Sequence, residues 1–153
     1  MTEKPKTIYI LVLLWLSLTA IFLTWGQFSL QIFLVLPEWN VEHPELEYLL
    51  SQLNFGYLIS TIVWFVFSSL FVVFAYATLR KDTWAWSTGL IISTIFLIIF
   101  SIMLAAFMIN AIMFLDWFSV AGLVTVVLSF VIDLGIVFFL TRPVTKIFFE
   151  NGN

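Results

Sequence analysis

One aspartate, Asp133, interrupts an otherwise apolar stretch of the chain, SFVIDLGIV at residues 129–137. A charged carboxylate at the centre of a membrane helix costs about 3 kcal/mol on insertion scales. Such a group binds a proton or cation in a transporter or channel, pairs with a cation from a partner protein, or joins helices through hydrogen bonds. No Lys, Arg or His lies at a similar depth in the apolar segments. We therefore expect Asp133 to be neutral and to bond to hydroxyl groups.

Other polar or small residues share the helical face of Asp133. Gly122, Thr125, Ser129 and Asp133 follow one another at spacings of three, four and four residues, which places them on one side of a helix. Asn110 is the other strongly polar side chain expected within an apolar segment. We predict a polar site within the membrane that includes Asp133, Ser129, Thr125 and Asn110. Five side chains of other segments are expected at a similar depth: Ser68, Ser69, Ser93, Thr94 and Trp15.

The segment EHPELE, residues 42–47, contains the side chains best suited to binding a metal ion. His43, Glu42, Glu45 and Glu47 offer nitrogen and oxygen donors, but zinc and copper sites usually contain more than one histidine. His43 is the only histidine in the chain. We interpret the segment as a solvated acidic loop and predict no metal and no other cofactor. A metal site completed by another chain is the alternative.

The composition is typical of a membrane protein. Of the 153 residues, 63% are hydrophobic and 10% are charged, whereas a soluble domain is about half apolar and about one quarter charged. The net charge of −3 argues against binding to nucleic acid, which requires clustered cations. The chain has no cysteine, no histidine in an apolar segment and no phosphate-binding loop, so we predict that it is not an enzyme.

Four segments contain the roughly 20 apolar residues that a membrane-spanning helix needs. They lie at about residues 7–25, with an extension to residue 36 left open, and at about 55–79, 84–108 and 118–140. These segments are too long and too uniformly apolar for barrel strands, which alternate over about 10 residues. The predicted fold is an all-α membrane protein, a single domain over residues 1–153 with four transmembrane helices in an antiparallel bundle. Residues 37–54 form the predicted external segment.

The charges predict the orientation of these spans. The cations flank the spans on one side: Lys4, Lys6, Arg80, Lys81, Arg142 and Lys146. The other side carries carboxylates: Glu38, Glu42, Glu45, Glu47 and Asp116. Because cytoplasmic loops are rich in Lys and Arg, both termini are predicted to lie in the cytoplasm, in a multi-pass protein of the cell membrane. We expect Arg80, Lys81, Arg142 and Lys146 to anchor the helix ends at the lipid interface.

The first span and the segment after it have further helical patterns. One face of this span is polar and turns toward a partner or a cavity: Ser17, Thr24, Gln27 and Gln31. A helix over residues 8–36 would be about 43 Å long, which exceeds the roughly 30 Å hydrocarbon core. In the external segment, Pro44 fits the first position of a short amphipathic helix that lies on the membrane or leads into the second span.

The C-terminal tail, VIDLGIVFFLTRPVTKIFFE, resembles the end of small uncharacterised prokaryotic four-helix membrane proteins. Those proteins often close their last helix with a pattern like Y-L-x-R-P-x-V-K-x-x-F. The residues that match lie within about twenty positions: Leu140, Arg142, Pro143, Lys146 and Phe149. The resemblance implies a membrane protein and no established activity. The residues alone account for the pattern, because Pro143 ends a helix and the two cations anchor its end at the interface.

Taken together, these features favour a non-catalytic integral membrane protein that serves as a structural or accessory subunit of a membrane protein complex. Its partners would be other membrane subunits or a second copy of the chain. The polar face and the long first helix are features that a monomer does not need. The alternative is a small transporter or channel in which Asp133 binds a proton or a cation. One carboxylate without a relay of other ionisable groups supports this alternative less well.

Overall fold

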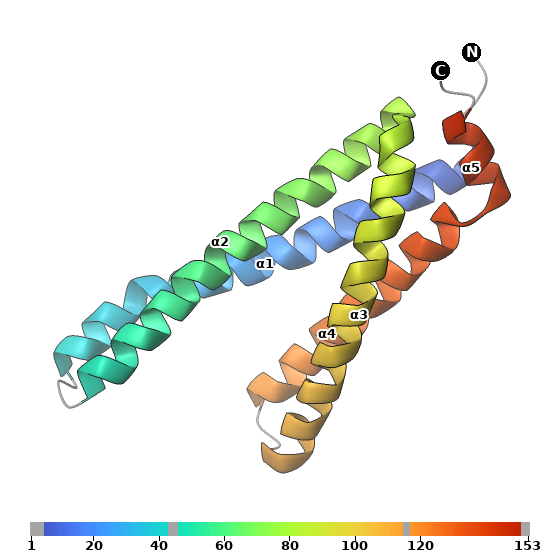
Figure 1. Ribbon diagram of the computed structural model, residues 1–153. Helices are drawn as coiled ribbons and strands as arrows, with labels where there is room; N and C mark the ends of the chain where they lie inside the picture. The colour runs from blue at the N-terminus through green and yellow to red at the C-terminus, as the bar shows by residue number, and fades with distance from the viewer. Residues whose placement is uncertain (1–4, 43–45, 115–116, 151–153) are drawn as a thin grey trace. The chain divides into compact units, whose positions relative to one another are not determined.

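The chain is an all-α protein. The computed structural model describes residues 5–42, 46–114 and 117–150, apart from the side chains of residues 39–42, 110–111, 113–114 and 117–119. Within this part of the chain, the helices labelled in Figure 1 are α1 (Lys6–Glu42), α2 (Glu47–Arg80), α3 (Thr83–Phe114), α4 (Trp117–Leu140) and α5 (Pro143–Glu150). Helices α1 to α4 are long and apolar enough to cross a membrane. These four helices indicate a multi-pass membrane protein.

Helices α1 and α2 are longer than the spans expected from the sequence. Helix α1 continues through residues 26–36 and contains Pro37 five residues before its end, where the missing N–H removes one internal hydrogen bond. Helix α2 begins at Glu47, whose carboxylate complements the positive end of the helix dipole. Residues 47–54, which were assigned to the external segment, are therefore the first turns of α2. Pro44 lies outside the described residues.

The buried residues of α1, and those of α2 from Thr61 onward, recur at steps of three, four or seven. On α1 they include Ile8, Val12, Trp15, Thr19, Phe22, Gly26, Ser29 and Leu36. On α2 they include Leu50, Thr61, Ser68, Phe71, Ala75 and Thr78. Both sets fit a seven-residue repeat, which is the spacing of helices that pack lengthwise against a neighbour.

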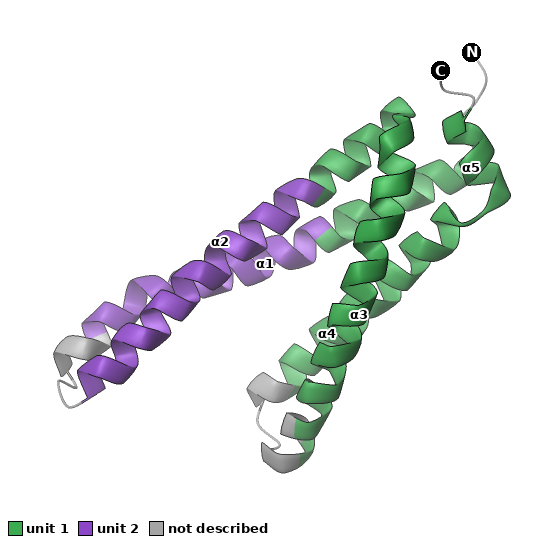
Figure 2. Cartoon of the chain, in the orientation of Figure 1, with its two compact units in different colours: residues 1–18, 71–153 green, residues 19–70 purple. Residues whose placement is uncertain are grey.

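The contacts divide the chain into two compact units, coloured separately in Figure 2. One unit consists of residues 1–18 and 71–153, and the other consists of residues 19–70. Helices α1 and α2 each contribute to both units, whereas α3, α4 and α5 belong to the first unit alone.

In the unit of residues 19–70, α1 and α2 pack through aromatic rings and a glycine. The Phe22 ring meets Trp64 edge-on, with 5.1 Å between the ring centroids. One turn further along α1, Gly26 allows close approach, because a Cβ atom there would lie 3.3 Å from both the Phe65 ring and Trp64 Cβ. A larger residue at position 26 would push the two helices apart.

Trp15 of α1 is a central residue of the other unit. Its indole is fully buried and stacks on Phe71 and Phe74 of α2, with centroid separations of 5.7 and 5.0 Å. Gly89 of α3 leaves room for the indole, because a Cβ atom there would lie 3.4 Å from Trp15 and 3.6 Å from Leu140 of α4. Residues of all four long helices therefore meet around Gly89.

Helices α2 and α3 are joined by a tight turn at Lys81 and Asp82. Lys81 has a left-handed backbone, with φ of 63°. Its N–H donates to the Thr78 carbonyl (3.3 Å), and the Asp82 N–H donates to the Ala77 carbonyl (3.1 Å). This pair of hydrogen bonds is a Schellman motif, which satisfies the last carbonyls of α2 and reverses the chain.

A fifth helix follows the fourth span, and the sequence analysis did not predict it. Helix α4 ends at Leu140, and Pro143 then occupies the first position of α5, where its fixed φ suits a helix. Phe148 and Phe149 are buried on one side of α5. They form a cluster with one residue from each of three other helices: Ile8, Ala77 and Ala85. Helix α5 therefore packs against α1, α2 and α3 within the unit of residues 1–18 and 71–153.

Candidate functional site

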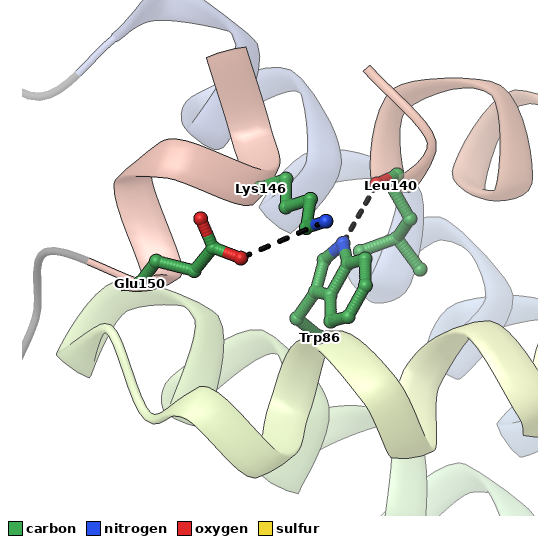
Figure 3. Close-up of polar contacts among 4 residues, drawn as sticks. All are labelled: Trp86, Leu140, Lys146 and Glu150. Carbon is green, nitrogen blue, oxygen red and sulfur yellow. Dashed lines mark hydrogen bonds and ion pairs between the residues drawn. The ribbon is translucent and has the colours of Figure 1, made fainter. Parts of the chain in front are cut away.

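Asp133 lies on the buried face of α4, in its interface with α3. This face consists of every third or fourth residue of the helix: Gly122, Val126, Ser129, Asp133, Ile136 and Leu140. Near one end of the interface, the Phe107 ring of α3 lies directly over Gly122. Near the other end, the Trp86 indole N–H of α3 donates to the Leu140 carbonyl (2.8 Å; Figure 3). The spacing of the buried residues therefore places Asp133 in the contact between α3 and α4.

The carboxyl group of Asp133 is enclosed by protein. It is 0% exposed, and neither oxygen makes a hydrogen bond of normal geometry to a described residue. The polar side chain that interacts with it from α3 is Ser93, which is also 0% exposed and whose hydroxyl has no hydrogen bond of normal geometry. Ser129, one turn before Asp133 on α4, is buried as well. One carboxyl and two hydroxyls thus lie in the α3–α4 interface.

The environment of Asp133 favours the neutral acid. An enclosed carboxylate with no cation beside it would bear a desolvation cost of several kcal/mol. A protonated carboxyl avoids this cost and has an O–H that can donate to the Ser93 hydroxyl. A hydrogen bond of this kind between membrane helices contributes about 0.6 kcal/mol on average. The site can therefore join α3 to α4, and the same carboxyl is the chain's candidate for binding a proton.

The residues predicted to join Asp133 in one polar site have different surroundings. Ser129 shares the buried face of α4 with Asp133. Thr125 lies beside this face, half-buried, and its hydroxyl donates to the Ala121 carbonyl of its own helix (3.0 Å). Asn110 lies in α3, and its side chain is outside the described part of the chain.

Of the five side chains expected at the depth of Asp133, Ser93 is the one that interacts with it. The other hydroxyls donate to backbone carbonyls: Ser69 to Phe65 (2.9 Å), Thr94 to Leu90 (2.8 Å) and Ser68 to Thr19 (3.3 Å). A pattern in the sequence distinguishes Ser93 from them. Ala85, Gly89 and Ser93 are small residues at intervals of four, and small residues mark the face on which a membrane helix approaches its neighbour.

The acidic segment before α2 lies largely outside the described residues. His43 and Glu45 are not described, and Glu42 is the last residue of α1, with its side chain not described. Glu47 is exposed in the first turn of α2. Among the residues that the structure describes, no group of three or more His, Cys, Asp or Glu side chains could hold a metal ion.

The four cations predicted to anchor the helix ends each lie against an aromatic ring. The cation-to-centroid distances are 5.6 Å for Arg80 and Tyr76, 4.7 Å for Lys81 and Phe148, 4.5 Å for Arg142 and Phe138, and 5.9 Å for Lys146 and Trp86. Two of these pairs join segments far apart in sequence, since Lys81 contacts α5 and Lys146 contacts α3. Each exposed cation–π pair contributes about 0.5–1 kcal/mol.

Comparison with known proteins identifies no relative. No protein-family model matches the chain, and no curated protein and no solved structure matches it. Its function therefore has to be argued from the residues and their geometry.

The substitution Asp133→Asn is expected to change the free energy of unfolding by less than about 1 kcal/mol, because an amide is close in size to a protonated carboxyl and can likewise donate to the Ser93 hydroxyl. Asp133→Lys, which buries a charge without a partner, is expected to prevent folding. Reversible unfolding in mixed detergent micelles measures both effects. A loss of about 3 kcal/mol or more in Asp133→Asn would show instead that the native carboxylate is charged and paired.

Proposed function

We propose that this chain is a non-catalytic, multi-pass protein of the cell membrane that serves as a structural or accessory subunit of a membrane protein complex. The observation that carries the proposal is the length of α1 and α2 together with the exposed apolar side chains at their far ends. At 37 and 34 residues, they are about 55 and 51 Å long. A hydrocarbon core of roughly 30 Å, crossed at a steep tilt of about 40°, accommodates only about 39 Å of helix. About three turns of α1 and two turns of α2 therefore extend beyond the hydrocarbon core.

The far ends of these two helices, residues 28–38 of α1 and 47–59 of α2, are nevertheless apolar and exposed. Their exposed large side chains are Leu34, Val35, Tyr48, Leu49, Leu53, Phe55 and Ile59, and Tyr48 is 80% exposed. A groove of about 310 Å³ also lies along α1 from Phe28 to Leu36. Apolar surface that extends beyond the hydrocarbon core loses its lipid cover, and a second protein can replace that cover.

The polar face of α1 points away from its contact with α2. Gln27 and Gln31 are exposed and lie about half a turn around the helix from the buried residues Phe22, Gly26 and Ser29. An amide group has two donors and one acceptor, so an outward-facing pair suits hydrogen bonds with another helix near the membrane boundary. Ser17 and Thr24, which complete this face, already donate to carbonyls of α1.

The proposal includes an orientation and an arrangement of the four spans. They form an antiparallel bundle with both termini in the cytoplasm, because the cations lie at the end of α2, just after α4, within α5 and near the start of α1. Helices α1 and α2 then present their far ends, with the carboxylates of Glu38 and Glu47, on the outside.

The orientation predicts how single cysteines will react, and the chain has no cysteine of its own. A membrane-impermeant maleimide added to intact cells is expected to label Glu47→Cys and not Glu150→Cys, because both positions are exposed but lie on opposite sides. Glu150→Cys should react after the membrane is permeabilised. Labelling of Glu150→Cys in intact cells, with protection of Glu47→Cys, would reverse the proposed orientation.

Purification in a gentle detergent is expected to recover the chain in a complex of fixed stoichiometry, measured by native mass spectrometry. Leu49→Ala with Leu53→Ala, at the far end of α2, should weaken that complex at least tenfold, because burying a leucine contributes about 1.5–3 kcal/mol. The matched control is Leu128→Ala with Leu134→Ala on α4, which removes two similarly exposed leucines within the membrane span. A strictly monomeric protein, or equal effects of the two pairs, would refute the subunit proposal.

A second candidate function rests on the enclosed carboxyl of Asp133. A small transporter or channel would use this group to bind a proton or a cation. It predicts that the purified chain in liposomes carries a proton- or cation-dependent flux, and that Asp133→Asn abolishes the flux while the protein stays folded. The matched control is Ser129→Ala, on the same buried face. A wild-type chain without flux would exclude this candidate and would leave the subunit proposal unaffected.

A further inference from the structure

The packing of α5 brings cations from two distant segments to one end of the unit of residues 1–18 and 71–153. Lys81, in the turn between α2 and α3, lies over the Phe148 ring of α5. Lys146 of α5 lies over the Trp86 ring of α3, and Trp86 packs against the cluster that contains Phe148. The two amines therefore border the same group of buried aromatic side chains, although 64 residues separate them in the sequence.

This end of the unit has more positive than negative charge. Residues 76–86 and 138–150 contain four cations, Arg80, Lys81, Arg142 and Lys146, and two carboxylates, Asp82 and Glu150. Glu150 lies 3.7 Å from Lys146, and both side chains are more than half exposed (Figure 3), so the pair is weak. Arg142 has its guanidinium over Phe138 and is exposed. The excess charge is positive here, whereas the whole chain has a net charge of −3.

The outer face of α5 is apolar between these cations. Val144 and Ile147, one turn apart, are 52% and 54% exposed, although Thr145, Phe148 and Phe149 on the inner face are buried. Arg142 and Lys146 lie four residues apart on one side of the chain, about half a turn around the helix from Val144, so these two like charges repel each other unless an anion lies near both. A ligand for this surface would combine a negative group with a hydrocarbon chain.

We propose that α5 and the α2–α3 turn bind the phosphate headgroup of an anionic phospholipid, with Lys81, Arg142 and Lys146 around the phosphate and Val144 and Ile147 beside an acyl chain. The site lies where four apolar helices end, which is where headgroups of a bilayer meet a membrane protein. Basic surfaces at this level bind anionic headgroups, and each Lys or Arg contributes about a fivefold gain in affinity. The proposal does not depend on the chain being a subunit of a complex.

The test uses the full-length purified chain, titrated with phosphatidylglycerol or phosphatidylcholine in detergent and observed by native mass spectrometry. The wild-type chain is expected to bind the anionic lipid more tightly. Arg142→Gln with Lys146→Gln should weaken phosphatidylglycerol binding about 30-fold and weaken phosphatidylcholine binding much less, because the choline cation of that lipid offsets the charge of its phosphate. The matched control, Lys6→Gln, removes an exposed cation of α1 that is not among the proposed phosphate contacts and should weaken binding no more than about fivefold.

Two further variants separate the site from its alternatives. Arg142→Lys with Lys146→Arg keeps both charges and should retain binding, which shows that a loss in the glutamine pair comes from charge and not from misfolding. Ile147→Ser should weaken phosphatidylglycerol binding, because it removes an acyl-chain contact. Equal losses in the glutamine pair and its control would overturn the proposal in favour of diffuse surface charge. Full displacement of the lipid by inorganic phosphate would overturn the assignment of the ligand as a lipid.

Discussion

Membrane helices gain little from burying apolar side chains against one another, because the lipid around them is equally apolar, so their association depends on close packing and hydrogen bonds. In this chain, close packing is achieved where an aromatic ring on one helix meets a glycine on another. Trp15 lies against Gly89 of α3, and the Phe107 ring lies over Gly122 of α4. In the other unit, Gly26 faces Phe65. A glycine opposite a ring gives a large contact area at a short distance between the helices, which two branched side chains would not allow.

The close contact of α3 with α4 also determines the properties of Asp133. Because Ser93 and Ser129 are small, the two helices enclose the carboxyl completely. Separating α3 from α4 would expose a carboxyl and two hydroxyls to lipid, which is costly. A shift of α4 by one residue along α3 would have the same consequence, because it would rotate Asp133 away from Ser93. We therefore regard the polar site as a constraint on which faces of α3 and α4 meet, in the way that a single buried polar residue fixes the alignment of a coiled coil.

The sequence could predict much of the fold, because the four apolar segments are far longer than a soluble protein's helices usually are. It could not predict α5. An isolated eight-residue helix is unstable, and α5 forms where Phe148 and Phe149 pack onto Ile8, Ala77 and Ala85 from three other helices.

The polar site was predicted in part. Asp133 and Ser129 do share one buried face of α4. The next buried position toward the start of that face is Val126 and not Thr125, and the Thr125 hydroxyl donates to a carbonyl of its own helix. Ser93 comes from α3, and which serine opposes Asp133 depends on how the helices pair.

The proposed subunit role rests on the exposed apolar ends of α1 and α2, because length alone does not distinguish them from α3, which has 32 residues and is about 48 Å long. Helix α4, at 24 residues or about 36 Å, fits a bilayer with a modest tilt. Helix α1 keeps its seven-residue packing repeat from Ile8 to Leu36, a stretch about one and a half turns longer than α4. Spanning a bilayer requires no such extension, because about 20 apolar residues are enough. An extended pair of helices with an apolar outer surface is useful when another protein binds it, and the amides of Gln27 and Gln31 give that contact its polar component.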